Sequence, residues 1–235
     1  MPIGIVVDVA AVLGGGLAGS LLTSRMSEQL KEQMNGIFGL CAMCMGISAV
    51  VLMQNMPAVV FSVILGTLLG LAFKLGNAIQ AATTKVLVKV AHNEDPDANA
   101  LMITAVVLFC ASGTGIYGAL DAGMTGNHSV LITKAILDFF TAMIFACKLG
   151  KATALISIPQ FAVLITLFAL AKIIVPMTTQ TMIADFKACG GFILMATGLR
   201  MMKLKLFPVA DMIPAMVLVM PVSCVWSQWL LPLLS

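Results

Sequence analysis

The chain has 235 residues, of which 60% are apolar and only 10% are charged, and its mean hydropathy is +1.08. Soluble domains are about a quarter charged, so this composition excludes a soluble globular protein and requires lipid as the solvent. The formal net charge of +3 comes without a dense basic cluster, which excludes a nucleic-acid-binding protein. The six cysteines lie in or beside apolar segments and indicate packing residues, not a disulfide framework or a metal site.

Eight apolar segments of about the length needed to cross a membrane follow one another in the chain. They are Ile3–Thr23, Gly36–Met53, Pro57–Phe73, Leu101–Leu120, Val130–Lys148, Ala152–Val175, Phe186–Met202 and Val209–Leu233. The first lacks a basic leader, so we interpret it as a span and not as a secretory signal. The last carries three prolines, which predict a kink or a break. The sequence therefore predicts an all-α bundle of about eight transmembrane helices, in one domain of residues 1–235; seven spans plus a re-entrant helix is the alternative.

Three polar segments lie between the apolar ones. Ser24–Asn35 and Leu75–Ala91 are compatible with helices and are expected at a membrane face. The second is amphipathic, with Lys85 and Lys89 one helical turn apart. His92–Asn99 is a hydrophilic loop that carries three of the ten acidic residues.

The distribution of lysine and arginine predicts the orientation of the spans, because cytoplasmic loops carry an excess of both. With eight spans and the N-terminus outside, three basic residues face outward: Lys134, Lys172 and Lys187. Ten then lie inside: Arg25, Lys31, Lys74, Lys85, Lys89, Lys148, Lys151, Arg200, Lys203 and Lys205. We therefore expect both termini on the periplasmic or extracellular side.

The two ends of the chain share a pattern that indicates an internal repeat. Two glycines seven residues apart occur in the second and seventh spans, at an offset of 152 residues: Gly39 and Gly46, then Gly191 and Gly198. The same offset relates Asp8 to Gln160. A shift of five spans would invert the second copy, as in many secondary transporters; the alternative is coincidence among common residues. The chain would then consist of repeat A, an amphipathic helix and loop, central spans and repeat B: residues 1–73, 75–99, 101–148 and 152–235.

A few polar side chains fall inside the apolar spans, where ionisable groups are costly and usually functional. Lys134 and Asp138 lie four residues apart in the fifth span, and therefore on one helix face. This pair is either a structural lock between helices or a transport or proton-relay site. Asp8, Gln160 and Asp121 are further candidates.

Small residues mark further positions of interest. Ser112 and Thr114 belong to a Ser-Gly-Thr-Gly run, which predicts either a broken helix that contacts a substrate or ion, or close packing of small residues. Gly190 and Gly191, at the head of the seventh span, are expected to present free amides to an anion. Other glycines predict close helix contacts within a protomer or across a dimer: Gly14, Gly15, Gly16, Gly19, Gly66 and Gly70.

The chain resembles the bacterial YdfK/YqgA-type membrane proteins, a family with a domain of unknown function. The resemblance is carried by VLFCASGTGIYGALDAG and LITKAILDFFTA (Val107 to Ala142), by Ala188–Met202, by Asp211–Ala215 and by Val6–Gly19, and covers nearly the whole chain. It implies a bacterial inner-membrane protein and a candidate transporter. The chain departs from the family pattern at Asp8, where asparagine is more usual, and at Leu71, where an acidic residue is common.

These features together predict a secondary transporter of a small polar solute or ion, acting as a homodimer in the inner membrane, with a midplane site between the inverted repeats. The expected site residues are Asp8, Ser112, Thr114, Asp121, Lys134, Asp138, Gln160, Gly190 and Gly191, without a metal or cofactor. Asp138 or Asp8 would carry the coupling proton or cation, and Lys134 would pair with an anionic group. The alternatives are a passive channel and a non-catalytic structural or regulatory membrane protein. An enzyme is not expected, because the motifs of intramembrane enzymes are missing from the sequence.

Overall fold

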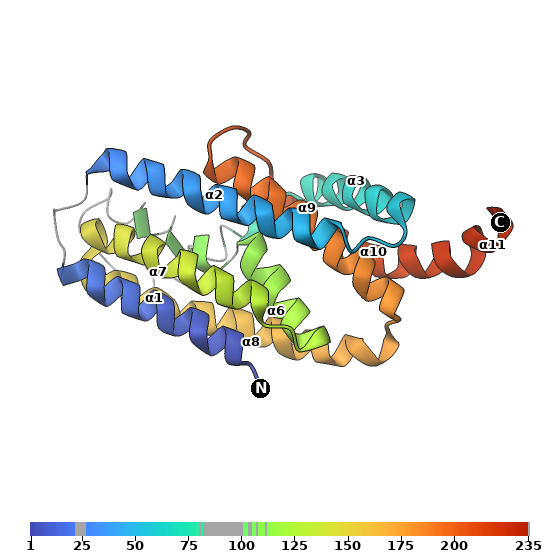
Figure 1. Ribbon diagram of the computed structural model, residues 1–235, viewed down its shortest axis with the longest axis horizontal. Coiled ribbons are helices and arrows are strands. Elements are labelled where there is room, and N and C mark those ends of the chain that lie inside the picture. Colours follow the sequence, from blue (N-terminus) through green and yellow to red (C-terminus); the bar gives the residue numbers. More distant parts are fainter. Residues whose placement is uncertain are drawn as a thin grey trace. The chain divides into compact units, whose positions relative to one another are not determined.

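A computed structural model describes residues 1–21, 27–79, 81, 101–102, 105–106, 108–110 and 112–234. The regular structure of these residues is helical throughout (Figure 1). The longer helices are α1 (Ile3–Leu21), α2 (Glu28–Val50), α3 (Met56–Ala72), α6 (Gly113–Thr125), α7 (Ser129–Leu149), α8 (Ser157–Ile174), α9 (Gln180–Met201) and α10 (Ile213–Val225). The 3-10 helices η1 (Gly150–Ile156), η2 (Val175–Met177) and η3 (Val209–Met212), the π-helical segment η4 (Trp226–Leu230) and the short α11 (Leu231–Leu234) complete the described structure.

Five stretches of the described chain are helical, long and apolar enough to cross a membrane: Ile3–Leu21, Glu32–Val50, Ser129–Met177, Gln180–Met201 and Val209–Leu230. The third is 49 residues long and holds two of the expected spans, α7 and α8. α3 is a shorter apolar helix of 17 residues. Large apolar side chains such as Ile64, Ile136 and Ile173 are exposed on these helices, as lipid contact requires. The predicted all-α bundle of membrane helices is confirmed.

The structure corrects several predicted boundaries. α9 begins at Gln180 and not at Phe186, because the Thr179 hydroxyl caps it by accepting a hydrogen bond from the Met182 amide at 3.2 Å. From Glu28 onward, the predicted interfacial segment forms the first turns of α2 and is not a separate helix. Its residues 24–26 lie outside the described part of the chain, as do the polar loop 92–99 and most of the amphipathic segment 75–91.

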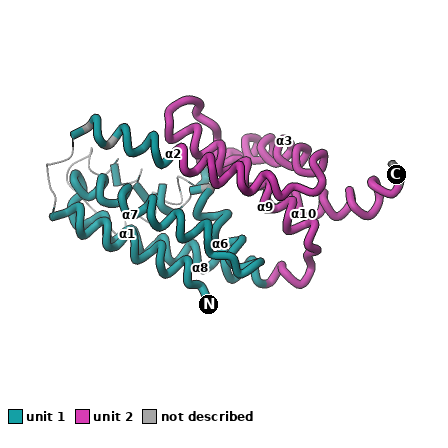
Figure 2. The backbone as a smooth tube through the Cα atoms, viewed as in Figure 1, with its two compact units in different colours: residues 1–38, 78–172 teal, residues 39–77, 173–235 magenta. Residues whose placement is uncertain are grey.

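The described chain divides into two compact units, shown in different colours in Figure 2. The first consists of residues 1–38 and 78–172, and the second of residues 39–77 and 173–235. Each unit combines helices from both halves of the chain. The first contains α1, α6, α7, η1 and nearly all of α8, and the second contains α3, α9 and α10.

In the first unit, α1 and α7 run in the same direction with their backbones in contact. A Cβ atom added at Gly15 would overlap the carbonyl oxygen of Phe139, and one added at Gly19 would overlap that of Met143. Because the contacts advance along both helices together, the two helices are parallel. The close contact predicted for these glycines is confirmed, and it lies within one protomer.

In the second unit, glycines bring two pairs of antiparallel helices together. α2 crosses α9 where a Cβ at Gly39 would lie 2.7 Å from the Gly198 oxygen, and a Cβ at Gly46 would lie 2.7 Å from the Gly191 oxygen. α3 packs on α10 and η3 in the same way. Its glycines Gly66 and Gly70 would, with side chains, overlap the backbones of Ala215 and Asp211.

Candidate functional site

Four polar side chains from three helices meet inside the first unit. Asp8 comes from α1, Lys134 and Asp138 from α7, and Gln160 from α8. Lys134 Nζ donates hydrogen bonds to Asp8 Oδ2 at 3.0 Å and to Asp138 Oδ2. Gln160 Nε2 donates to the same two oxygens, at 2.9 Å and 3.3 Å respectively. Two donors therefore bridge two carboxylates in a closed arrangement, which we call the polar quartet.

The polar quartet is enclosed by the fold. Asp8 and Gln160 are fully buried, Lys134 is nearly so, and the Asp138 side chain is 13% exposed. With all three ionisable groups charged, one ammonium faces two carboxylates, which leaves a net charge of −1. An unbalanced charge in an apolar interior is expensive, so the site favours an additional positive charge.

Two oxygens of the polar quartet have no hydrogen-bond donor among the described residues. They are Asp8 Oδ1 and Gln160 Oε1, and both are buried. Buried polar atoms are rarely left without a partner, so this pair indicates a missing donor or cation. In the described part of the chain, no group of three or more His, Cys, Asp or Glu side chains could hold a metal ion.

The predicted fourth span is interrupted beside the polar quartet. Residues 108–110 are helical, but Ser112 has φ −70° and ψ 141°, and α6 starts only at Gly113. The Ser112 hydroxyl accepts a hydrogen bond from the Gly115 amide at 3.1 Å, as an N-cap does. A Cβ at Gly115 would lie 3.1 Å from Lys134 Cε, so the first turn of α6 packs on the lysine chain. The helix is therefore interrupted at Ser112, and its small residues also pack closely, since a Cβ at Gly118 would lie 2.9 Å from Leu131. Contact with a substrate or ion stays a prediction.

A second irregularity precedes Gln160. The chain reverses at Gly150, whose φ of 61° suits glycine, and returns first as the 3-10 helix η1. The change to α-helix occurs at Ser157, whose hydroxyl donates to the Ala154 carbonyl at 2.7 Å. Pro159 falls in the first turn of α8, where no amide donor is needed, and Gln160 follows. Short 3-10 stretches inside long helical runs often mark hinges.

Three of the predicted site residues do not belong to the polar quartet. Asp121 is buried on α6 and accepts a hydrogen bond from the Thr125 hydroxyl at 3.0 Å, but it lies six residues beyond Gly115, about 9 Å along the helix. Gly190 and Gly191 belong to the second unit, in the middle of α9. The prediction that they offer free amides is wrong, because the helix starts ten residues earlier. Gly191 instead packs against the backbone of α2.

The sequence analysis missed Asp185, a fully buried acid in the second unit. Its Oδ1 accepts hydrogen bonds from the backbone amides of Gln54 and Asn55 at 2.8 and 2.9 Å. Its Oδ2 accepts from Asn55 Nδ2 at 2.9 Å and from the Ser223 hydroxyl at 2.6 Å. The predicted span began at Phe186, one residue later, and so left this acid outside. With both oxygens supplied by neutral donors at the N-terminus of α3, Asp185 is a structural anchor.

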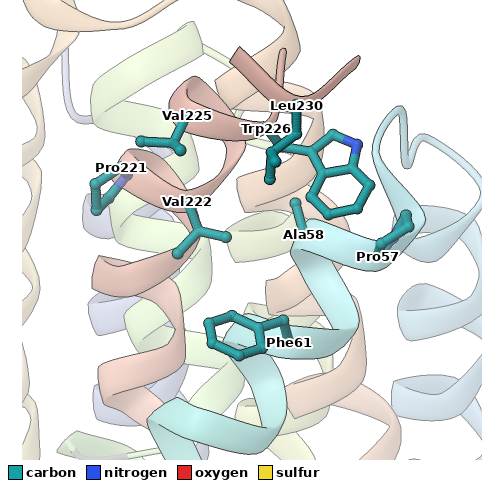
Figure 3. Close-up of a pocket in the computed structure, with 8 residues that line it drawn as sticks. All are labelled: Pro57, Ala58, Phe61, Pro221, Val222, Val225, Trp226 and Leu230. Atoms are coloured by element: carbon teal, nitrogen blue, oxygen red, sulfur yellow. The ribbon is translucent and has the colours of Figure 1, made fainter. Parts of the chain in front are cut away.

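The second unit also has a pocket of about 530 Å³, shown in Figure 3. Its lining is apolar and comes from α3, α10 and the π-helical segment: Pro57, Ala58, Phe61, Pro221, Val222, Val225, Trp226 and Leu230. Pro221 inside α10 and the π-helix after it confirm that the last span is irregular. The pocket offers no charged group to a polar solute, so the polar quartet is the candidate functional site.

A bundle of apolar helices that encloses such a quartet defines a multi-pass membrane protein with a polar intramembrane site. Residues 3–224 match the family described as "Protein of unknown function (DUF554)", and the chain belongs to that family. It is 46% identical over 233 residues to "Uncharacterized protein YqgA" of Escherichia coli K12, covering 97% of this chain and 99% of the relative. It is 21% identical over 217 residues to "Uncharacterized membrane protein YdfK" of Bacillus subtilis 168, covering 92% and 93%. No solved structure matches the chain.

Proposed function

We propose that this membrane protein is a secondary transporter of a small polar solute or ion, and that the polar quartet is its coupling site. The observation that carries the proposal is the composition of that site. Two carboxylates, one ammonium and one amide from three helices are buried together with a surplus negative charge. Such a group can bind and release a proton or a cation, which a coupled transporter needs.

The broken helix next to the site supports this proposal. The amides of Gly113 and Thr114 open α6 and, like the first amides of any helix, have no acceptor within it. Secondary transporters commonly bind solutes at such interruptions, because backbone groups are free to contact them. In the polar quartet, Lys134 already donates to both acids, so the α6 amides are better placed than this lysine to receive an anionic group.

The predicted inverted repeat supports the same proposal. Asp8 and Gln160, which the 152-residue offset relates, are joined by the 2.9 Å hydrogen bond. The paired glycines of α2 and α9 also face one another in crossed order, because Gly39 lies against Gly198 and Gly46 against Gly191. We infer that spans one to three and six to eight are inverted copies, with the coupling site between their first helices.

We further propose a homodimer in the bacterial inner membrane with both termini on the periplasmic side. The ten-to-three distribution of basic residues supports this orientation. Cysteine-accessibility labelling at each terminus of the protein in intact cells tests it. Labelling only after permeabilisation would indicate the opposite orientation. The protein would act without a cofactor and without chemical change to its solute.

Reconstitution into liposomes tests the transport function. We would impose a pH gradient or a Na⁺ gradient and measure the uptake of labelled amino acids, organic acids, sugars and inorganic ions. Asp138→Asn removes one charge from the polar quartet. Thr133→Val is the matched control, because this neighbouring hydroxyl donates only to the backbone of its own helix, at 2.9 Å to Ser129. We expect gradient-driven accumulation by the wild type and the control, and its loss in Asp138→Asn.

Each alternative has its own outcome. Flux that never concentrates a solute under any gradient would identify a passive channel. Unchanged accumulation in Asp138→Asn would refute a coupling role for this acid. An absence of flux for every solute, with the protein correctly folded, would favour a structural or regulatory role for the polar quartet.

A further inference from the structure

The two oxygens without donors belong to groups that already touch each other. Asp8 Oδ2 accepts a hydrogen bond from Gln160 Nε2 at 2.9 Å, while Asp8 Oδ1 and Gln160 Oε1 have no partner among the described residues. A carboxylic acid and a primary amide are both planar and can form two antiparallel hydrogen bonds. One is N–H to carbonyl oxygen, and the other is acid O–H to amide oxygen. The first of these bonds is present here, and the two oxygens that the second would join are both buried and without a partner in the described part of the chain.

We propose that Asp8 binds a proton on Oδ1 and donates it to Gln160 Oε1, so that the two side chains form a two-bond acid–amide pair. One proton accounts for three observations at once. It gives Gln160 Oε1 a donor, it turns Asp8 Oδ1 into a donor with an acceptor, and it removes the surplus charge of the polar quartet. Lys134 and Asp138 then remain as a neutral ion pair on one face of α7.

Asp8 is the better of the two acids for this proton. Its side chain is fully buried and its second oxygen has no donor, whereas Asp138 is partly exposed. Asp138 also pairs with Lys134 within one helix, four residues away. An ionised carboxylate is stabilised by water and by a close ammonium, so the negative charge belongs on Asp138 and the proton on Asp8.

The charged and titratable groups on the packed elements agree with this assignment. α7 presents Lys134 and Asp138 to Asp8, and α8 presents the neutral Gln160. Lys151 on η1 is exposed. α6 carries buried Tyr117 in its second turn and buried Asp121 one turn further on. Buried Cys110 lies just before the helix break.

Proton binding is a simple exchange with water. An O–H bond forms at Asp8 Oδ1 with a proton taken from the aqueous phase, and it breaks when the site opens to water again. That this proton drives transport rests on the proposed function, but the protonation itself does not. In a transport cycle, a solute or cation that displaced Gln160 from Asp8 would remove the acceptor of the acid and favour release of the proton.

Infrared difference spectroscopy of the full-length protein in lipid nanodiscs tests the proposal. A protonated carboxyl has a carbonyl band apart from the amide bands, and this band shifts in D₂O. We expect the band in the wild type and its loss in Asp8→Asn, which keeps the shape of the pair. It should persist in the control Asp185→Asn, a buried acid already supplied with donors. It should also be lost in Asp138→Asn, because Asp8 would then be the remaining acid that pairs with Lys134 and would ionise. In Gln160→Leu it should move to higher frequency, because the acid loses both hydrogen bonds.

Three outcomes would overturn the proposal. One is a band that survives Asp8→Asn, and another is a band whose frequency Gln160→Leu leaves unchanged. The third is a wild type without the band whose folding is stabilised by Na⁺ or K⁺ in an Asp8-dependent way, which would assign the site to an alkali cation. The readout does not require transport. A band at Asp8 without solute flux would refute only the transporter, and flux without the band would refute only the protonation.

Discussion

Replacing Gly15 by alanine tests the close contact between α1 and α7 on which the polar quartet depends. The added Cβ would overlap the Phe139 carbonyl oxygen and lie 3.1 Å from the Phe139 Cα, so a backbone and not a flexible side chain must yield. To restore ordinary contact, the helices would have to separate by about 1 Å. Gly14→Ala is the matched control, because its Cβ would meet only a ring carbon of Phe139 at 3.8 Å.

The two substitutions are expected to change the free energy of unfolding in opposite directions. Alanine in place of glycine favours a helix by about 1 kcal/mol, so Gly14→Ala should be neutral or slightly stabilising. At Gly15, overpacking costs about 1–3 kcal/mol. A separation of about 1 Å would also break the 3.0 Å hydrogen bond between Lys134 and Asp8, which adds on the order of 1 kcal/mol or more. We expect a net destabilisation of about 2 kcal/mol, and a Tm lower by on the order of 5 °C.

Thermal unfolding of the purified protein, followed by size-exclusion chromatography after heating, measures this difference. Both variants change a glycine to alanine on the same helix one residue apart, so lipid, detergent and helix propensity are matched. If Gly15→Ala proves as stable as Gly14→Ala, the close approach of α1 and α7 is wrong. The geometry of the polar quartet, which depends on this close approach, would then be wrong as well.

Two further predictions concern buried charges. Lys134→Met should destabilise the protein by about 3–5 kcal/mol, because the Asp138 carboxylate loses its ammonium. Adding Asp138→Asn should recover much of the loss, and an additive double mutant in the Tm assay would contradict the ion pair. Asp185→Ala should lower the free energy of unfolding by at least about 3 kcal/mol, because four donors lose their acceptor. Ser223→Ala, which removes one of these donors, should lower it by about 1 kcal/mol. If the two variants have the same Tm, Asp185 is not a structural anchor.

Composition alone predicted the helical membrane fold, because a chain with 10% charged residues cannot cover a soluble surface. Spacing also placed Lys134 and Asp138 on one helix face, which the structure confirms. The contacts of this pair with Asp8 and Gln160 could not be derived from spacing. They join residues 126 and 22 positions apart, and only the packing of three helices determines them.

The errors have physical causes too. The start of the seventh span was predicted from hydropathy, which changes near Phe186, whereas the helix starts where Thr179 caps it. Asp185 was lost for the same reason, because a buried acid at a helix end resembles a solvated one in sequence. Gly190 and Gly191 were expected at a helix N-terminus, and the true start of α9 places them mid-helix.

The net charge of the polar quartet distinguishes a structural ion pair between helices from a coupling site. A lock between helices needs one lysine and one acid, since a neutral pair has the lowest cost of burial. Asp138 and Lys134 already form such a pair within α7, and a second acid adds a charge that the lock does not need. Asp8 nevertheless lies fully buried against both donors. A second buried acid is suited to a charge that is gained and lost, which supports the proposed exchange of a proton over a fixed cross-link. Asp8→Asn distinguishes the two interpretations. If Asp8 is part of a coupling site, the variant should fold normally and lose gradient-driven accumulation. If the polar quartet is a fixed cross-link, the variant should keep the flux of the wild type.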